Sequence, residues 1–158
     1  MALRTIVLEG DEILRKKSRT VTEFNEKLWI LLDDMKETMY ANNGAGLAAP
    51  QVGVLRRVAV VDAGDGLVEL INPEIVKTTG FQEDYEGCLS SPGEYGMVVR
   101  PRKVRVKAFD RNGNEFYVVG EDLLARALCH EIDHLNGILF KDHATEIVHK
   151  DLSEKSED

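Results

Sequence analysis

The chain has 158 residues, of which 28 are Asp or Glu and 20 are Lys or Arg, so its formal net charge at pH 7 is −8. A hydrophobic fraction of 43% beside 30% charged residues is typical of an ordinary globular protein with one core. The acidic balance argues against a dedicated nucleic-acid-binding protein, because such proteins present a basic surface to phosphates. We expect one domain over residues 1–150 and a polar tail, residues 151–158, that frays.

The sequence contains no apolar run near the roughly 18 residues that a membrane-spanning helix needs. Its first residues reach Glu9 and Asp11 before any long apolar stretch, which argues against a secretory signal. We therefore expect no membrane segment and a cytoplasmic location. Cys88 and Cys129 are then expected as free thiols in a reducing compartment.

The first predicted helix runs from about Thr22 to Met39, with Thr20 and Glu23 as its capping box. Apolar residues recur at helical spacing along one face of it: Phe24, Leu28, Leu31, Leu32, Met35 and Met39. We expect this face, the methionines and Trp29 to belong to the core and to have no functional role.

Short strands are predicted in the middle of the chain, at Val58–Asp62, Leu67–Asn72, Lys103–Phe109 and Glu115–Val119. Between the last two, the pair Asn112-Gly113 predicts a type I′ hairpin turn, because both central residues of that turn need positive φ. Several antiparallel strands following one helix are typical of the α+β class rather than of alternating βαβ units.

A second helix is predicted from its cap Asp122 to Leu135, ending at Asn136-Gly137, a sequence typical of a left-handed helix ending. Apolar residues occur almost all round it, so it should run through the core. The predicted fold is therefore α+β, with small antiparallel sheets packed around this central buried helix. An N-terminal helix and a C-terminal helix or tail complete it, and residues 145–150 are the candidate for a short C-terminal helix.

The predicted central helix carries His130-Glu131-Ile132-Asp133-His134, an HExxH motif. Histidines four residues apart project from one face of a helix with β-carbons roughly 5–6 Å apart, so both imidazoles can reach one tetrahedral cation. Glu131 would point beside that cation, where a carboxylate can accept a proton from a bound water. The plainer interpretation is a pair of histidines packed in the core, and it stays open at this point.

A catalytic cation needs a third protein ligand. His143 and His149 follow the predicted helix in a polar segment, where we expect them to be exposed. Cys88 lies in a short segment punctuated by Gly87 and Pro92, and a turn there can aim a thiolate inward. One thiolate and two imidazoles would leave an open position for water, which is typical of a catalytic site.

Two other metal sites could use the same helix. A closed structural zinc site would be formed by Cys88, Cys129, His130 and His134, with no position left for water. A zinc peptidase would instead take Glu146 as third ligand and leave Cys88 unused. Because one residue along a helix turns the side chain away, we expect Cys129 to be a buried residue that takes no part in metal binding.

Three segments in order carry a resemblance to a known family: residues 44–51 (GAGLAAPQ), 86–90 (EGCLS) and 130–134 (HEIDH). They resemble the three motifs of peptide deformylase, and the resemblance extends from about residue 3 to residue 142. That family consists of metallohydrolases that remove the N-formyl group from the formyl-methionine of nascent polypeptides and release formate. The resemblance therefore implies an enzyme whose partners are N-formyl-methionyl nascent peptides.

The resemblance also implies roles for individual residues. Cys88, His130 and His134 would hold the metal, normally Fe²⁺, for which Zn²⁺, Ni²⁺ or Co²⁺ can substitute. Glu131 would be the general base that takes a proton from the metal-bound water, leaving the hydroxide that attacks the formyl carbon, and later delivers this proton to the leaving amine. The side-chain amide of Gln51 and the backbone N–H of Leu89 would donate to the oxyanion.

For the substrate, the resemblance implies an extended peptide that adds as a strand along Gly44, Ala45 and Gly46, whose small size allows a close backbone approach. Leu89, Ala127 and the apolar stem of Arg126 would line the methionine pocket. An ordinary salt bridge is the expected role of the Arg126 head group. The chain end offers few cations, so its composition does not support ribosome contact.

The chain departs from the family pattern at three positions. Ser91 stands where isoleucine or valine is usual, Asn43 where an acidic residue is common, and Ala45 where a branched residue is frequent. We expect these departures to change substrate preference, with a smaller and more polar pocket rim at Ser91, and to leave the metal ligands unaffected.

Overall fold

The computed structural model describes residues 2–150, so the tail predicted to fray, residues 151–158, lies outside the described residues. Two α-helices and eight strands make up the described part, together with three short 3₁₀ helices. In chain order they are η1 (Glu12–Arg15), α1 (Glu26–Ala41), β1 (Gly46–Ala48), η2 (Ala49–Val52), β2 (Val58–Val61), β3 (Val68–Thr79), β4 (Gln82–Gly87), β5 (Glu94–Arg100), β6 (Lys103–Phe109), β7 (Glu115–Glu121), α2 (Leu123–Leu135), η3 (Phe140–Asp142) and β8 (Ile147–His149).

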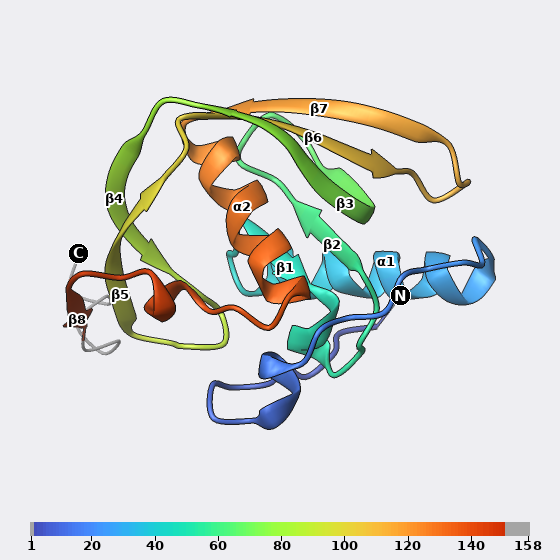
Figure 1. The fold of residues 1–158 in the computed structure, drawn as a ribbon. Coiled ribbons are helices and arrows are strands. Elements are labelled where there is room, and N and C mark those ends of the chain that lie inside the picture. Colours follow the sequence, from blue (N-terminus) through green and yellow to red (C-terminus); the bar gives the residue numbers. More distant parts are fainter. Residues whose placement is uncertain (1, 151–158) are drawn as a thin grey trace.

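The strands form two antiparallel sheets around α2. One has five strands in the order β1-β2-β3-β6-β7, and the other has three in the order β4-β5-β8. Helix α2 crosses the middle of the molecule and contacts strands of both sheets, while α1 packs against β1 and β2 (Figure 1). The predicted α+β class with a central helix is confirmed.

Helix α2 is buried along most of its length, with ten of its 13 residues inside the protein. It ends where predicted, because Gly137 has φ 74°, and a Cβ there would overlap the carbonyl oxygen of Arg15. The predicted cap is wrong in one respect. Asp122 stands at the N-cap position, but it has φ 52° and its side chain makes no capping hydrogen bond.

Helix α1 begins later than predicted, at Glu26 instead of Thr22. Its N-cap is Asn25, whose side-chain oxygen accepts a hydrogen bond from the backbone N–H of Leu28 at 3.3 Å, so the capping box with Thr20 is wrong. Five of the six residues of the predicted apolar face are buried on α1, whereas Phe24 precedes the helix and is half-buried. Trp29 is not part of this face: this side chain is 37% exposed, and its indole N–H donates to the carbonyl of Arg111.

Strand positions agree with the prediction better than their ends and connections do. Strand β6 has the predicted bounds, whereas β3 continues to Thr79. The turn before β7 is not type I′, since only Gly113 of its central pair has positive φ. Residues 147–149 form β8 against β5, so the predicted C-terminal helix over 145–150 is also wrong.

Among the described residues no helix is long and apolar enough to cross a membrane.

Candidate metal centre

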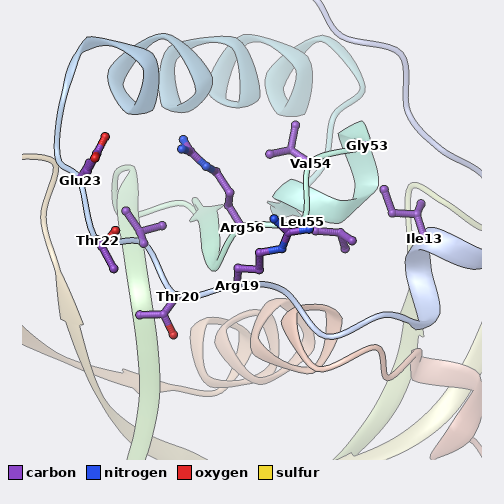
Figure 2. A pocket seen from close by; sticks show the side chains of 10 residues that line it. Ile13, Arg19, Thr20, Thr22, Glu23, Gly53, Val54, Leu55 and Arg56 are labelled. Carbon is purple, nitrogen blue, oxygen red and sulfur yellow. The ribbon is translucent and has the colours of Figure 1, made fainter.

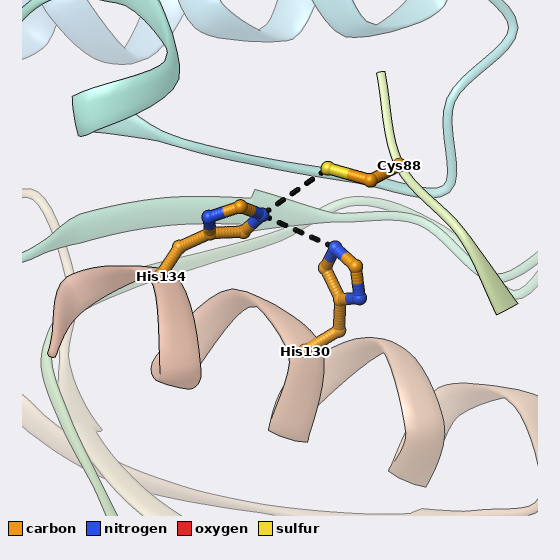
Figure 3. A group of neighbouring side chains, drawn as sticks. All are labelled: Cys88, His130 and His134. Carbon is orange, nitrogen blue, oxygen red and sulfur yellow. Dashed lines mark hydrogen bonds between the residues drawn. The ribbon is translucent and has the colours of Figure 1, made fainter. Parts of the chain in front are cut away.

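Three ligand atoms converge where α2 passes beneath the loop that follows β4. His134 Nε2 lies 3.3 Å from Cys88 Sγ and 3.2 Å from His130 Nε2. Figure 3 marks both contacts with dashed lines. All three atoms lie within 4.8 Å of one another. An ion bound tetrahedrally at about 2.0–2.3 Å from each ligand would separate them by roughly 3.3–3.6 Å. The three side chains predicted as ligands therefore fit a single cation.

The alternative ligands lie elsewhere in the described residues. His143 approaches Asp133 at 3.2 Å, the side chain of His149 is 75% exposed, and Glu146 is exposed. Cys129 packs in the hydrophobic core, where burial raises the pKa of its thiol to about 11. The only candidate metal-binding group in residues 2–150 is the three-ligand one, so the four-ligand site with Cys129 is wrong.

The two histidines are kept in different environments. His130 turns Nδ1 toward Glu86 Oε2, 2.9 Å away, which leaves Nε2 facing His134. Burial and the neighbouring His130 lower the pKa of His134 well below its ordinary value. Burial also opposes the charged form of His130, but Glu131, Cys88 and Glu86 raise the pKa of that ring, so without a cation the proton of the pair resides on His130. A neutral imidazole offers a lone pair to a cation, and a carboxylate behind the second nitrogen of a ligand histidine fixes its orientation.

Glu86 is the residue of this site that sequence reasoning missed. Burial opposes its ionisation, but hydrogen bonds from His130 and Arg100 lower its pKa to about 2, so it is a carboxylate. Arg100 donates two hydrogen bonds to it, at 2.6 and 3.2 Å, and Arg126 donates a third at 3.2 Å. The sequence offered one signal for this role: Glu86 stands two residues before the proposed ligand Cys88, and ligand histidines regularly pair with a carboxylate.

Glu131 lies beside the ligands without pairing to protein. It is 4% exposed, its Oε1 has no hydrogen-bond partner among the described residues, and burial raises the pKa of its carboxyl to about 7. A Cβ at Gly46 would overlap this carboxyl group, so only glycine fits at that point of β1. The arrangement leaves an uncommitted, buried carboxyl next to the candidate metal position.

Gln51 reaches the site from η2. Its Oε1 accepts from the backbone N–H of Ala48 at 2.9 Å, and its Nε2 donates to Ser90 Oγ at 3.1 Å and lies 3.4 Å from Cys88 Sγ. Leu89 lies between Cys88 and Ser90, and its backbone N–H donates to no protein acceptor within residues 2–150. Both predicted N–H donors therefore lie beside the sulfur.

Two of the predicted substrate-binding residues, Gly44 and Gly46, lie against Leu89 and Glu131 of the same site. Strand β1 is an edge strand of the five-stranded sheet. Gly44 precedes β1 and lies so close to Leu89 that a Cβ at residue 44 would come within 2.7 Å of Leu89 Cδ1. Ala45 is exposed, and Ala127 is buried on α2. The head group of Arg126 pairs with Glu86, which is the salt-bridge role expected for it.

One cavity of the described residues lies away from this site. It has a volume of about 530 Å³ and lies between the N-terminal segment and the loop before β2 (Figure 2). Its lining consists of residues Ile13, Arg19, Thr20, Val21, Thr22, Glu23, Gly53, Val54, Leu55 and Arg56. None of them is a candidate ligand, so the donor atoms and not the size of a cavity mark the site.

Comparison with known proteins agrees with this geometry. The model of a family described as polypeptide deformylase matches residues 3–150. A peptide deformylase from Thermoanaerobacter pseudethanolicus is 57% identical over 155 residues, which cover 98% of both chains. The solved peptide deformylase structure from Legionella pneumophila has a TM-score of 0.87 at 49% identity, covering 90% of this chain and 86% of that one. The structure from Thermotoga maritima has a TM-score of 0.89 at 40% identity, covering 91% and 99%.

Proposed function

The chain belongs to the polypeptide deformylase family, and from this we propose that it removes the N-formyl group from the formyl-methionine of nascent polypeptides and releases formate. One observation carries the proposal: a thiol and two imidazoles converge beside a buried carboxyl whose Oε1 has no hydrogen-bond partner in residues 2–150. The test is formate release from a formyl-Met tripeptide by protein of known metal content. Absence of turnover in fully metal-loaded protein would reject the proposal. Since nascent chains are its substrates, we expect the enzyme in the cytoplasm.

We propose that Cys88, His130 and His134 hold Fe²⁺, the metal implied by the family. The donor set supports this, because a thiolate with two imidazoles suits Fe²⁺ as well as Zn²⁺, Ni²⁺ and Co²⁺. When bound, such a cation lowers the pKa of a water toward neutrality and polarises a carbonyl group. The residues of this chain would then supply proton transfer, donors to the oxyanion and substrate orientation.

In the proposed reaction Glu131 accepts a proton from the water that attacks the formyl carbon and passes it to the leaving amine. A general base works best when its pKa is near the working pH, and in the protein without a bound cation burial raises the pKa of this carboxyl to about 7. Because Oε1 has no protein partner in the described residues, no internal hydrogen bond has to break before the carboxyl accepts a proton.

Gln51 and Leu89 would stabilise the negative charge that develops on the formyl oxygen. The amide of Gln51 is held by Ala48 and Ser90 on either side, so its N–H is oriented before substrate arrives. The side chain of Leu89 lies against Gly44, and we propose that it forms a wall close to the reacting carbon. A wall close to the reacting carbon excludes an acetyl methyl by steric clash.

The substrate peptide is proposed to add as a strand beside Gly44, Ala45 and Gly46. The described residues offer no strand on the outer edge of β1, so its backbone groups there can pair with an extended chain. The methionine side chain would lie against Leu89, Ala127 and the stem of Arg126. The ion pair with Glu86 fixes that stem.

Replacing Gln51 by methionine should lower kcat by roughly 10²–10³-fold with a smaller change in KM, because one donor to the oxyanion is lost. Steady-state formate release measures both constants. As a matched control, Ser90→Ala removes the acceptor that orients Gln51 but keeps the donor, so its loss should be smaller. Equal activity of the Gln51 variant and wild type would remove this residue from the mechanism.

Replacing Glu86 by glutamine should weaken metal binding by roughly 10–100-fold, because His130 loses the carboxylate behind it. Two guanidinium groups would also lose a buried partner, so unfolding free energy should fall by about 3–5 kcal/mol. Chelator competition and denaturant titration measure the two effects. Glu83→Gln, an exposed position on the same strand, should change neither. Unchanged metal affinity in the Glu86 variant would contradict its role.

A further inference from the structure

A cluster of polar side chains joins the N-terminal segment to the loop that carries Cys88. Oε2 of Glu9 accepts hydrogen bonds from Ser91 Oγ at 2.9 Å and from Lys141 Nζ at 2.7 Å. Lys141, on η3, also contacts Oε1 of Glu94 at 2.6 Å. The Glu9, Glu94 and Lys141 side chains are between 22% and 29% exposed, and Ser91 is buried. We call Glu9, Ser91, Glu94 and Lys141 the Glu9 cluster.

Backbone hydrogen bonds connect the same segment to both proposed oxyanion donors. The N–H of Glu9 donates to the carbonyl of Ser90 at 2.8 Å, and the N–H of Val7 donates to the carbonyl of Gln51 at 2.7 Å. Within the loop, the N–H of Ser91 donates to the carbonyl of Cys88 at 3.0 Å. Residues 7–9 therefore bridge two stretches of chain that lie far apart in sequence, one bearing Gln51 and the other bearing Leu89.

Ser91 does not act as its sequence position led us to expect. It was predicted to make the rim of the methionine pocket smaller and more polar. Instead its side chain is 6% exposed and its hydroxyl is engaged with Glu9. Where an isoleucine or valine could only pack, this serine is tied to a carboxylate, and that carboxylate is tied to Lys141. The departure at residue 91 is thus matched by a charged partner on the N-terminal segment.

We propose that Glu9 is a positioning residue, which through Ser91 and Lys141 holds the Cys88–Ser91 loop so that the N–H groups of Leu89 and Gln51 face one point. The inference rests on the proposed function. An exposed ion pair would contribute little. The Glu9 carboxylate differs because it is partly buried and paired with two side-chain donors, Ser91 and Lys141. The backbone N–H of Glu9 also donates a hydrogen bond to the loop. A displacement near 1 Å in such a loop is enough to slow a reaction without preventing binding.

The test compares Glu9→Gln with Glu12→Gln in the metal-loaded protein. Glu12 is exposed on η1, and its side chain makes no hydrogen bond or ion pair with another described residue. Glu12→Gln therefore makes the same change in charge outside the Glu9 cluster. For Glu9→Gln we expect roughly tenfold lower kcat, KM within about twofold of wild type and unchanged metal content. Hydrogen exchange at the amide of Ser91 should become faster, while exchange at Leu32 inside α1 stays the same.

A double-mutant cycle with Ser91→Ala separates positioning from general stability. If Glu9 acts through Ser91, the double variant should lose no more kcat than the Glu9 variant alone. The inference is overturned by unchanged kcat, by an equal loss in Glu12→Gln, or by faster exchange at Leu32 as well as at Ser91. If wild-type protein releases no formate, the proposed function fails. In that case hydrogen exchange at the amide of Ser91 in Glu9→Gln still tests whether Glu9 holds the loop. Unchanged exchange at this amide would overturn the positioning role of Glu9 as well.

Discussion

Replacing Glu131 by glutamine should lower formate release by roughly 10²–10⁴-fold while the protein keeps its full complement of metal. Glutamine has nearly the same shape, so it fits beside Gly46, but it cannot take up a proton at neutral pH. The fold should not suffer, because Oε1 of Glu131 makes no hydrogen bond to the described residues that would be lost. Metal analysis, thermal unfolding and single-turnover kinetics on the same sample test the three expectations.

The matched control for Glu131 is Asp133, two residues further along α2. Its carboxylate is paired with Arg100 and His143. Unlike the carboxyl of Glu131, it is therefore not an unpaired group beside the ligands. Asp133→Asn should therefore cost far less activity than Glu131→Gln. If the Glu131 variant keeps a tenth or more of wild-type turnover, another group must handle the proton and the proposed mechanism is wrong.

The metal ligands were predictable to different degrees. The spacing of His130 and His134 alone places both rings on one face, and their Nε2 atoms lie 3.2 Å apart in the structure. Cys88 is 42 residues earlier than His130 in the chain. No periodicity connects the two, so reasoning from the residues left the third ligand open and the family resemblance selected it.

Other features depend on contacts that a linear pattern does not contain. Helix α1 begins late because the backbone of Val21 is hydrogen-bonded to the side chain of Asn72 on β3, which keeps the segment before Asn25 out of the helix. Likewise, residues 147–149 become a strand because β5 offers them an edge. Tertiary pairing of this kind overrides local helix or turn preference.

Buried charge around His130 is balanced by groups that come from separate elements. Glu86 on β4 and Asp133 on α2 supply two carboxylates, and Arg100 on β5 and Arg126 on α2 supply two guanidinium groups. A buried ion pair needs well-aligned hydrogen bonds to offset desolvation, and this network supplies several. Its consequence for function is that Nδ1 of His130 stays committed to Glu86, so Nε2 remains directed at the candidate metal position.

Replacing Cys88 by alanine should abolish stoichiometric metal binding and, with it, formate release. Two imidazoles alone form an incomplete site, so the loss of affinity should exceed the roughly 10–100-fold expected for an outer partner such as Glu86. The protein should still fold, because Cys88 is only partly buried and belongs to neither hydrophobic core cluster. Elemental analysis after gel filtration, with circular dichroism on the same fraction, measures both.

Cys129→Ala is the matched control, since it removes the other thiol and leaves the three proposed ligands in place. This variant should keep metal and activity, with a modest loss of stability from the core cavity it creates. Metal retained at wild-type affinity without Cys88 would favour the alternative in which Glu146 completes a peptidase site, although that residue is exposed. Metal lost only when Cys129 is removed would instead revive the closed zinc site, and either result would remove the thiolate of Cys88 from the proposed centre.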